Sequence, residues 1–126
     1  MDTADSGARS ILSRFAEALS LGDAEGAAAY FAPDATYSEP PRFAFSGRAA
    51  IAAFFSDFTA RHREVSFTVA RVLAAPDGQL AAAEWRFAYT SSSDGARTVF
   101  EGMCWVELAA DGLIARWRGF SARVEG

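Results

Sequence analysis

Apolar residues recur at helical spacing in the first half of the chain. Their period predicts three helices, over residues 8–21, 24–32 and 48–62. Asp23 precedes the second helix and can cap it, and Pro33 is expected to stop it. This half of the chain is therefore expected to supply helices that each have one apolar face.

The second half alternates apolar and polar residues, which is the period of a strand. Four long runs are expected to be strands: residues 64–75, 79–91, 96–109 and 113–124. A shorter pair, residues 35–39 and 43–47, is expected to form a hairpin between the second and third helices. Hairpin-connected strands form an antiparallel sheet, and helices gathered on one face of such a sheet give an α+β layer architecture.

Alternation also predicts which side chains share a face of the sheet. In the third long run one face is apolar and partly small, and it comprises Phe100, Gly102, Cys104, Val106 and Leu108. The outward face combines charges with Met103, Trp105 and, from the last run, Phe120. Large apolar groups on a charged surface are typical of protein contacts, so we expect a homodimer through this outer face. The alternative is that Trp105 lies flat on the surface of a single chain.

Composition narrows the class of protein. With 126 residues the chain can form one domain, residues 1–126, with a core of its own. A net charge of −4 argues against a nucleic-acid partner, which usually requires a basic stripe. A single cysteine forms no internal disulfide and no Cys/His cluster has zinc spacing, so we expect a cytoplasmic protein without a metal. The polar N-terminus and the lack of a long apolar run argue against a signal peptide and a membrane partner.

One carboxylate lies in unusual surroundings, in the stretch YFAPDATYSEPP of residues 30–41. On an extended segment Tyr37 and Glu39 point to the same side, among apolar neighbours. A carboxylate enclosed by apolar side chains is a stronger base than one in water, which makes Glu39 a candidate catalytic residue. The alternative is an acid at a strand end that is exposed or paired with Arg42 or Arg48.

The inward-facing aromatic residues are candidates for a pocket wall, because ligand pockets are mostly apolar with a few directed polar groups. They are Phe15, Phe54, Phe58, Trp85, Phe87, Tyr89, Phe100 and Trp117. The alternative is that they only fill the core. Cys104 has no cation placed near it by the sequence and is expected to be a small buried residue rather than a nucleophile. His62 follows a helix between two arginines and is expected to be exposed.

Three stretches carry a resemblance to a known superfamily: LGDAEGAAAYFAPDATYSEP, FSGRAAIAAFF and LAADGLIARWRGF. Together with the order of elements they resemble the nuclear transport factor 2-like proteins, which include ketosteroid isomerase and the polyketide-cyclase-like (SnoaL-like) proteins. The resemblance covers about residues 8–123. It implies a cone-shaped barrel in which a curved antiparallel sheet wraps around three N-terminal helices.

The resemblance also implies a function. The open end of the cone would admit a small hydrophobic ligand, lined by the aromatic residues above together with Tyr37 and Cys104, with no cofactor. Glu39 stands where ketosteroid isomerases carry their general base. Phe15 and Cys104, however, stand where those enzymes carry a tyrosine and a second acid that stabilise the enolate.

The two missing donors argue against the isomerase mechanism in its familiar form. One oxyanion donor is worth about 3–4 kcal/mol, or a factor of roughly a hundred to a thousand in rate. Tyr37 or Tyr89 could supply a hydroxyl instead. Two hypotheses therefore remain. The first is a cofactor-independent isomerase, cyclase or dehydratase that uses Glu39 as its base on a small hydrophobic carbonyl compound. The second is a non-catalytic module that binds a small molecule or a protein.

Overall fold

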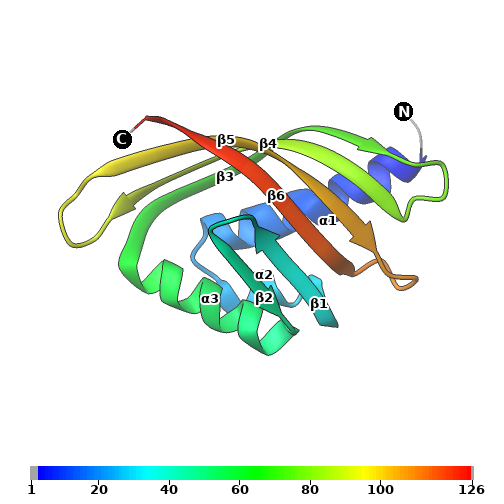
Figure 1. Ribbon diagram of the computed structural model, residues 1–126, viewed down its shortest axis with the longest axis horizontal. Coiled ribbons are helices and arrows are strands. Elements are labelled where there is room, and N and C mark those ends of the chain that lie inside the picture. Colours follow the sequence, from blue (N-terminus) through cyan, green and yellow to red (C-terminus); the bar gives the residue numbers. More distant parts are fainter. Residues whose placement is uncertain (1–2, 126) are drawn as a thin grey trace.

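The computed structural model describes residues 3–125, and the side chains of residues 6–124, as an α+β fold (Figure 1). Residues 1, 2 and 126 of the predicted domain lie outside the described residues. The elements in chain order are α1 (Thr3–Ser20), α2 (Ala24–Ala28), β1 (Phe31–Glu39), β2 (Phe43–Ser46), α3 (Arg48–Arg61), β3 (His62–Ala74), β4 (Leu80–Ser91), β5 (Arg97–Leu108) and β6 (Ile114–Glu125). The predicted fold class, with its curved sheet and three helices, is confirmed.

The strands form one curved sheet in the order β2-β1-β6-β5-β4-β3, with the helices on its concave side (Figure 1). Within residues 3–125 the sheet does not close, because β2 and β3 are its two edges and do not pair with each other. One detail of the prediction was wrong: β1 and β6 pair in parallel. Parallel neighbours need a long connection, and α3 together with β3–β5 provides it.

The second helix is shorter than its pattern predicts. Asp23 caps it as expected, since Oδ1 accepts a hydrogen bond of 2.9 Å from the backbone N–H of Gly26. The chain then leaves the helix after Ala28 and enters β1 at Phe31, which pairs with Ile114 of β6. Pro33 lies inside this strand at an irregularity of the pairing, where a missing N–H costs no regular ladder bond.

The core lies between α1, α3 and the concave face of the sheet. Phe15 is 0% exposed at its centre. Its ring contacts four other rings, with centroid separations from 5.2 to 5.7 Å, namely those of Phe31, Phe55, Phe67 and Trp117. Most of these contacts are edge-to-face, the arrangement that aromatic pairs prefer. The two helices are thus joined to the sheet by a solid cluster of rings.

A glycine allows a large ring to lie close to the sheet. A Cβ atom at Gly102 would stand 2.6 Å from the Trp85 ring and 2.5 Å from the carbonyl oxygen of Phe120. No side chain fits in that space, so Trp85 packs directly against the backbone of β5. The small residues predicted on the inner face of this strand are therefore explained by the rings that cover them.

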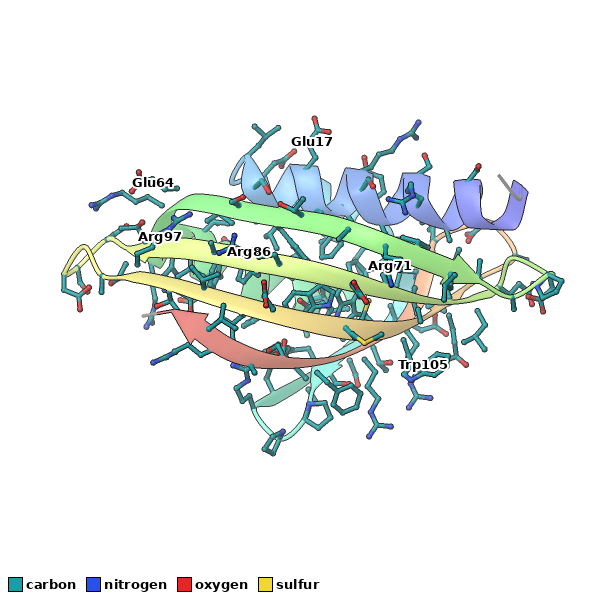
Figure 2. The ribbon with its side chains drawn as sticks, turned by 90° about the horizontal axis from the view of Figure 1, so that it is seen from above. Glu17, Glu64, Arg71, Arg86, Arg97 and Trp105 are labelled. Carbon is teal, nitrogen blue, oxygen red and sulfur yellow. The ribbon has the colours of Figure 1, made fainter. Side chains whose placement is uncertain are left out.

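The outer face of the sheet is seen from above in Figure 2, with Arg71, Arg86 and Trp105 projecting from it. Trp105 is 55% exposed, and Met103 and Phe120 are exposed beside it. The outward direction of these three residues is therefore as predicted, while a partner for them stays a prediction. Within residues 3–125, none of the helices has the length and apolar character needed to cross a membrane.

Candidate functional site

A cavity of about 140 Å³ lies between the helices and the concave face of the sheet. The predicted site residues that line it are Tyr37, Glu39, Phe54, Phe58, Trp85, Phe87, Tyr89, Phe100 and Trp117. Six further lining residues were not among the predicted site residues: Leu19, Arg42, Phe43, Phe55, Phe67 and Ser121. Most of the wall is aromatic, and its polar groups are gathered at one end.

Two predicted site residues do not line this cavity. Phe15 is enclosed by the four rings of the core cluster, which leaves none of its surface facing the cavity. Cys104 lies buried on the inner face of β5, next to the indole of Trp85. Burial raises the pKa of its thiol to about 12, so the thiol stays protonated and is a poor nucleophile. The indole N–H of Trp85 has this thiol, a weak acceptor, beside it and no other hydrogen-bond partner within residues 6–124.

Glu39 is buried and paired at the same time. It is 8% exposed, and its Oε1 accepts hydrogen bonds from Nη2 of Arg42 and from Oγ of Ser121. Nη2 of Arg42 also contacts Oγ of Ser121, which closes a three-membered polar cluster. Glu39 thus lines the cavity and is also paired with Arg42, while its role as a base stays a prediction. Arg48 is occupied elsewhere and donates a 2.8 Å bond to the carbonyl oxygen of Phe31.

Local structure explains this cluster, which is called the polar end from here on (Glu39, Arg42 and Ser121). The chain turns sharply after β1, and the backbone N–H of Arg42 donates a 2.8 Å bond to the carbonyl oxygen of Glu39. This turn folds the arginine back over the acid. Ser121 comes from the central part of the sheet, two residues after Gly119 on the inner side of β6. The spacing of Trp117, Gly119 and Ser121 was the sequence signal that could have found it.

The guanidinium of Arg42 also contacts an aromatic ring. Its Cζ lies 4.7 Å from the centroid of the Phe100 ring, and Cζ of Arg123 lies 5.8 Å from the same centroid. Such cation–π contacts hold a guanidinium flat against a ring. The Arg42 side chain is 42% exposed, so the polar end reaches the surface of the molecule.

Tyr37 lies on the same face of β1 as Glu39, as alternation predicts, and both line the cavity. Burial, and secondarily the neighbouring Cys104, raise the pKa of the Tyr37 hydroxyl well above its usual range. The hydroxyl therefore keeps its proton and can donate a hydrogen bond. Within residues 6–124 it forms no hydrogen bond with a protein atom. The ring itself is fixed, stacked on Phe43 with the centroids 5.6 Å apart.

The expectation that His62 is exposed was wrong, because the ring is half-buried between two aromatic residues. It stacks on Phe58 at 4.2 Å and meets the edge of Tyr89 at 4.6 Å, measured between centroids. Its Nδ1 lies 2.8 Å from the carbonyl oxygen of Phe58. Because a carbonyl oxygen can only accept a hydrogen bond, Nδ1 must carry the proton. His62 braces two rings of the cavity wall and does not line the cavity.

Metal ligands do not gather at this site. Among the described residues there is no group of three or more His, Cys, Asp and Glu side chains that could hold a metal ion. The acid–base groups at the cavity are those of Glu39, Tyr37 and Tyr89, with Arg42 as the neighbouring cation. The arrangement can therefore place one carboxylate and a tyrosine hydroxyl against an apolar molecule.

Comparison with protein families identifies one match. The family model of the SnoaL-like domain matches residues 12–117 of the chain. No curated protein matches the sequence. Residues 12–117 run from within α1 to the first residues of β6, so the matched region includes most of the cavity wall.

Solved structures share the fold at low sequence identity. A candidate polyketide cyclase from Xanthomonas campestris pv. campestris has a TM-score of 0.81 at 21% identity, covering 94% of this chain and 92% of that one. An LEH-like epoxide hydrolase of Mycobacterium tuberculosis has a TM-score of 0.80 at 20% identity, covering 94% of this chain and 84% of that one. RV0760c of M. tuberculosis, in complex with estradiol-17β-hemisuccinate, has a TM-score of 0.77 at 19% identity, covering 90% and 92%. At such identities the likeness is one of fold.

Proposed function

The chain belongs to the SnoaL-like domain family, and from this premise we propose that it is a cofactor-independent enzyme. Its substrate is a small hydrophobic carbonyl compound, and its reaction is an isomerisation, a cyclisation or a dehydration that begins with proton abstraction. The observation that carries the proposal is the position of Glu39, a carboxylate that is 8% exposed in the wall of an aromatic cavity. A carboxylate in an apolar cavity can contact a C–H bond of a bound ligand from which water is excluded.

The hydrogen bonds of Glu39 leave one oxygen for the reaction. Arg42 and Ser121 both contact Oε1, and within residues 6–124 Oε2 forms no hydrogen bond. Contacts on Oε1 fix the plane of the carboxylate and so aim Oε2. Arg42 and Ser121 thus orient the carboxylate without engaging its second oxygen.

The proposed reaction begins when Oε2 of Glu39 takes a proton from the carbon next to the carbonyl group. The electron pair of the broken C–H bond forms a C=C bond, and the carbonyl oxygen becomes an enolate oxygen. The Tyr37 hydroxyl, which is protonated and has no hydrogen-bond partner among residues 6–124, donates a hydrogen bond to that oxygen. Glu39 then returns its proton to the enolate, at the same carbon or at another one. Tyr37 thereby supplies one of the donors that Phe15 and Cys104 do not.

Names of structural neighbours support this class of ligand. The relatives of similar fold include a candidate polyketide cyclase and a protein in complex with a steroid hemisuccinate. Cyclases of polyketides act on carbonyl compounds, and a steroid is an apolar ring system. The aromatic wall of the present cavity suits an apolar ring.

Exchange of carbon-bound protons with solvent tests the proposal without knowledge of the natural substrate. Phenylacetone in D₂O would be followed by NMR for loss of its α-protons in the presence of the protein. Glu39→Gln is expected to slow this exchange by about a hundredfold or more, within the range expected for a positioned base. Glu107→Gln is the matched control, because Glu107 is also paired with an arginine, Arg116, but on the outer face. Exchange that survives Glu39→Gln would overturn the proposal.

The alternative function is a non-catalytic binding module of the same fold. It is favoured by the pairing of Glu39 with Arg42, which engages the acid before any ligand arrives. In that case the protein would bind phenylacetone without accelerating its α-proton exchange. The same experiment therefore separates the two functions.

A further inference from the structure

The size of the cavity limits its ligand. About 140 Å³ is close to the volume of an engineered cavity, roughly 150 Å³, that accommodates benzene. Ordinary pockets for drug-sized molecules are larger, at about 300–1,000 Å³. The cavity is enclosed on most sides by rings that already contact one another, such as Phe54 with Phe43 at 4.8 Å. Its volume therefore matches a single ring more closely than a fused ring system.

The charge at the polar end selects the ligand further. Of the Arg42 guanidinium, only Nη2 is engaged by Glu39 and Ser121. Within residues 6–124 its Nη1 and Nε form no hydrogen bond, and the group is held against Phe100 at 4.7 Å. A guanidinium offers a planar fork of N–H donors that matches a carboxylate. Arg42 thus presents a second, open edge beside the cavity.

The position of Arg42 joins these two features. Its side chain lines the cavity, yet it is 42% exposed, so it stands where a ligand held in the aromatic wall reaches the surface. The guanidinium of Arg123 also contacts the Phe100 ring, with its Cζ 5.8 Å from the ring centroid. This end of the cavity therefore gathers two guanidinium groups beside one carboxylate, in a chain whose net charge is −4.

We propose that the ligand is a single-ring apolar molecule that carries a carboxylate, with its ring in the aromatic cavity and its carboxylate bound by the open edge of Arg42. This inference rests on the proposed function and names its substrate class: a one-ring carbonyl compound that is also a carboxylic acid. A monoanion is compatible with the neighbouring Glu39, because Arg42 lies between the two carboxylates. A phosphate with two charges would be repelled more strongly by the same acid.

A matched set of probes tests the inference by calorimetric titration. Phenylacetate and phenylacetamide have the same ring and differ in charge, while 2-naphthylacetate keeps the charge and adds a ring. Phenylacetate is expected to bind about tenfold more tightly than either of the others. Equal affinity for phenylacetate and phenylacetamide would overturn the charge selection. Tighter binding of 2-naphthylacetate would overturn the size limit, and no binding of phenylacetate would overturn both.

Two arginine variants test which residue selects the carboxylate of the ligand. Arg42→Gln is expected to abolish the preference for phenylacetate over phenylacetamide, mainly by weakening the binding of phenylacetate. Arg118→Gln is the control, because Arg118 contacts the ring of Phe120 in the same way, at 5.3 Å, but on the outer face. A preference that persists in Arg42→Gln, or disappears in Arg118→Gln, contradicts the role of Arg42.

Glu39→Gln separates this inference from the proposed function. Removing the acid is expected to strengthen phenylacetate binding several-fold, since Arg42 loses its competing partner, while α-proton exchange is lost. If charge selection is present but exchange does not depend on Glu39, the proposed function fails and the ligand class stands. If exchange depends on Glu39 but phenylacetate is not preferred, the ligand class fails and the proposed function stands. Weaker phenylacetate binding in Glu39→Gln would overturn the assigned position of the carboxylate.

Discussion

Aromatic side chains line both ends of the interior, but they pack more closely at one end than at the other. The packed end is the ring cluster around Phe15, and the polar end is the part of the cavity beside Glu39, Arg42 and Ser121. At the packed end, Phe15 contacts four rings at 5.2 to 5.7 Å and is 0% exposed. At the polar end, Phe100 has one ring neighbour among the described side chains, Tyr89 at 6.4 Å, and the guanidinium groups of Arg42 and Arg123 contact its ring. A ring that is surrounded by rings stabilises the fold, and a ring with an open side forms the wall of a cavity.

The difference shows how a core can contain a site without a separate domain or a long loop. The packed end joins α1 and α3 to the sheet, so the polar end does not need to be closely packed. The cavity of about 140 Å³ and the buried acid Glu39 both lie where ring packing is incomplete. Stability and chemistry are therefore expected to respond to substitutions at different ends.

The largest effect is expected for Phe15→Ala at the packed end. Loss of a buried phenylalanine typically destabilises a protein by about 3–5 kcal/mol, because the transfer free energy of the ring and the cost of the cavity add. Urea denaturation would measure the free energy of unfolding. Phe100→Ala at the polar end is the matched substitution, and it is expected to cost only about 1–2 kcal/mol. Equal losses at the two positions would remove the distinction between the ends.

The next effect concerns rate rather than stability. Tyr37→Phe is expected to slow α-proton exchange of phenylacetone by about a hundredfold, since removal of one oxyanion donor costs roughly 3 kcal/mol in the transition state. The free energy of unfolding should change little, because the hydroxyl has no protein partner within residues 6–124. Tyr89→Phe is the control, and it separates the two tyrosines that could serve as donor. An unchanged rate in Tyr37→Phe would assign the enolate oxygen to another group.

Sequence patterns predicted the inner and outer faces well because alternation is a local property of a strand. Trp85 and Trp117 were placed inward and Trp105 outward, and the structure has them so. The parallel pairing of β1 with β6 was not predicted, since it depends on contacts between distant segments. The early end of α2 has a similar cause, because the pairing of Phe31 with Ile114 overrides the local helical pattern.

The candidate site was predictable in its residue types more than in its geometry. Tyr37 and Glu39 share a face by strand period alone, and both line the cavity. Whether rings fill a space or surround it depends on distances of about an ångström, which no periodicity encodes. The return of Arg42 onto Glu39 depends on the turn after β1, and Ser121 joins them across the sheet. These contacts determine which carboxylate oxygen is free.

A smaller effect should appear at alkaline pH. Burial raises the pKa of the Cys104 thiol from an ordinary value of 9.0 to about 12. Below pH 9 the thiol is protonated in both the folded and the unfolded chain, and its contribution to the free energy of unfolding is complete. Between pH 9 and pH 12 the unfolded chain loses the proton first, so the free energy of unfolding falls by about 1.4 kcal/mol per pH unit. By pH 10.5 the loss is expected to reach about 2 kcal/mol.

Denaturation from pH 7 to pH 10.5 would measure this slope in the wild type and in Cys104→Ala. The variant is less stable at pH 7 but should lose less stability as the pH rises. Tyr37 adds a loss of the same sign above pH 10 in both proteins, because burial raises its pKa too. Parallel slopes in the two proteins would mean that the thiol titrates normally in the folded state.

The smallest effect on folding is expected at the outer face, where Trp105 is 55% exposed beside a shallow apolar hollow lined by Met103 and Phe120. We propose that two copies of the chain pair through this face. Trp105→Glu should then convert a dimer to a monomer in light-scattering measurements, and change the free energy of unfolding of the monomer by less than about 0.5 kcal/mol. Leu73→Glu, at an exposed leucine elsewhere on the sheet, should leave the dimer intact. A monomeric wild type would mean that Trp105 simply lies on the surface. All of the buried large rings would then belong to the two ends of the interior.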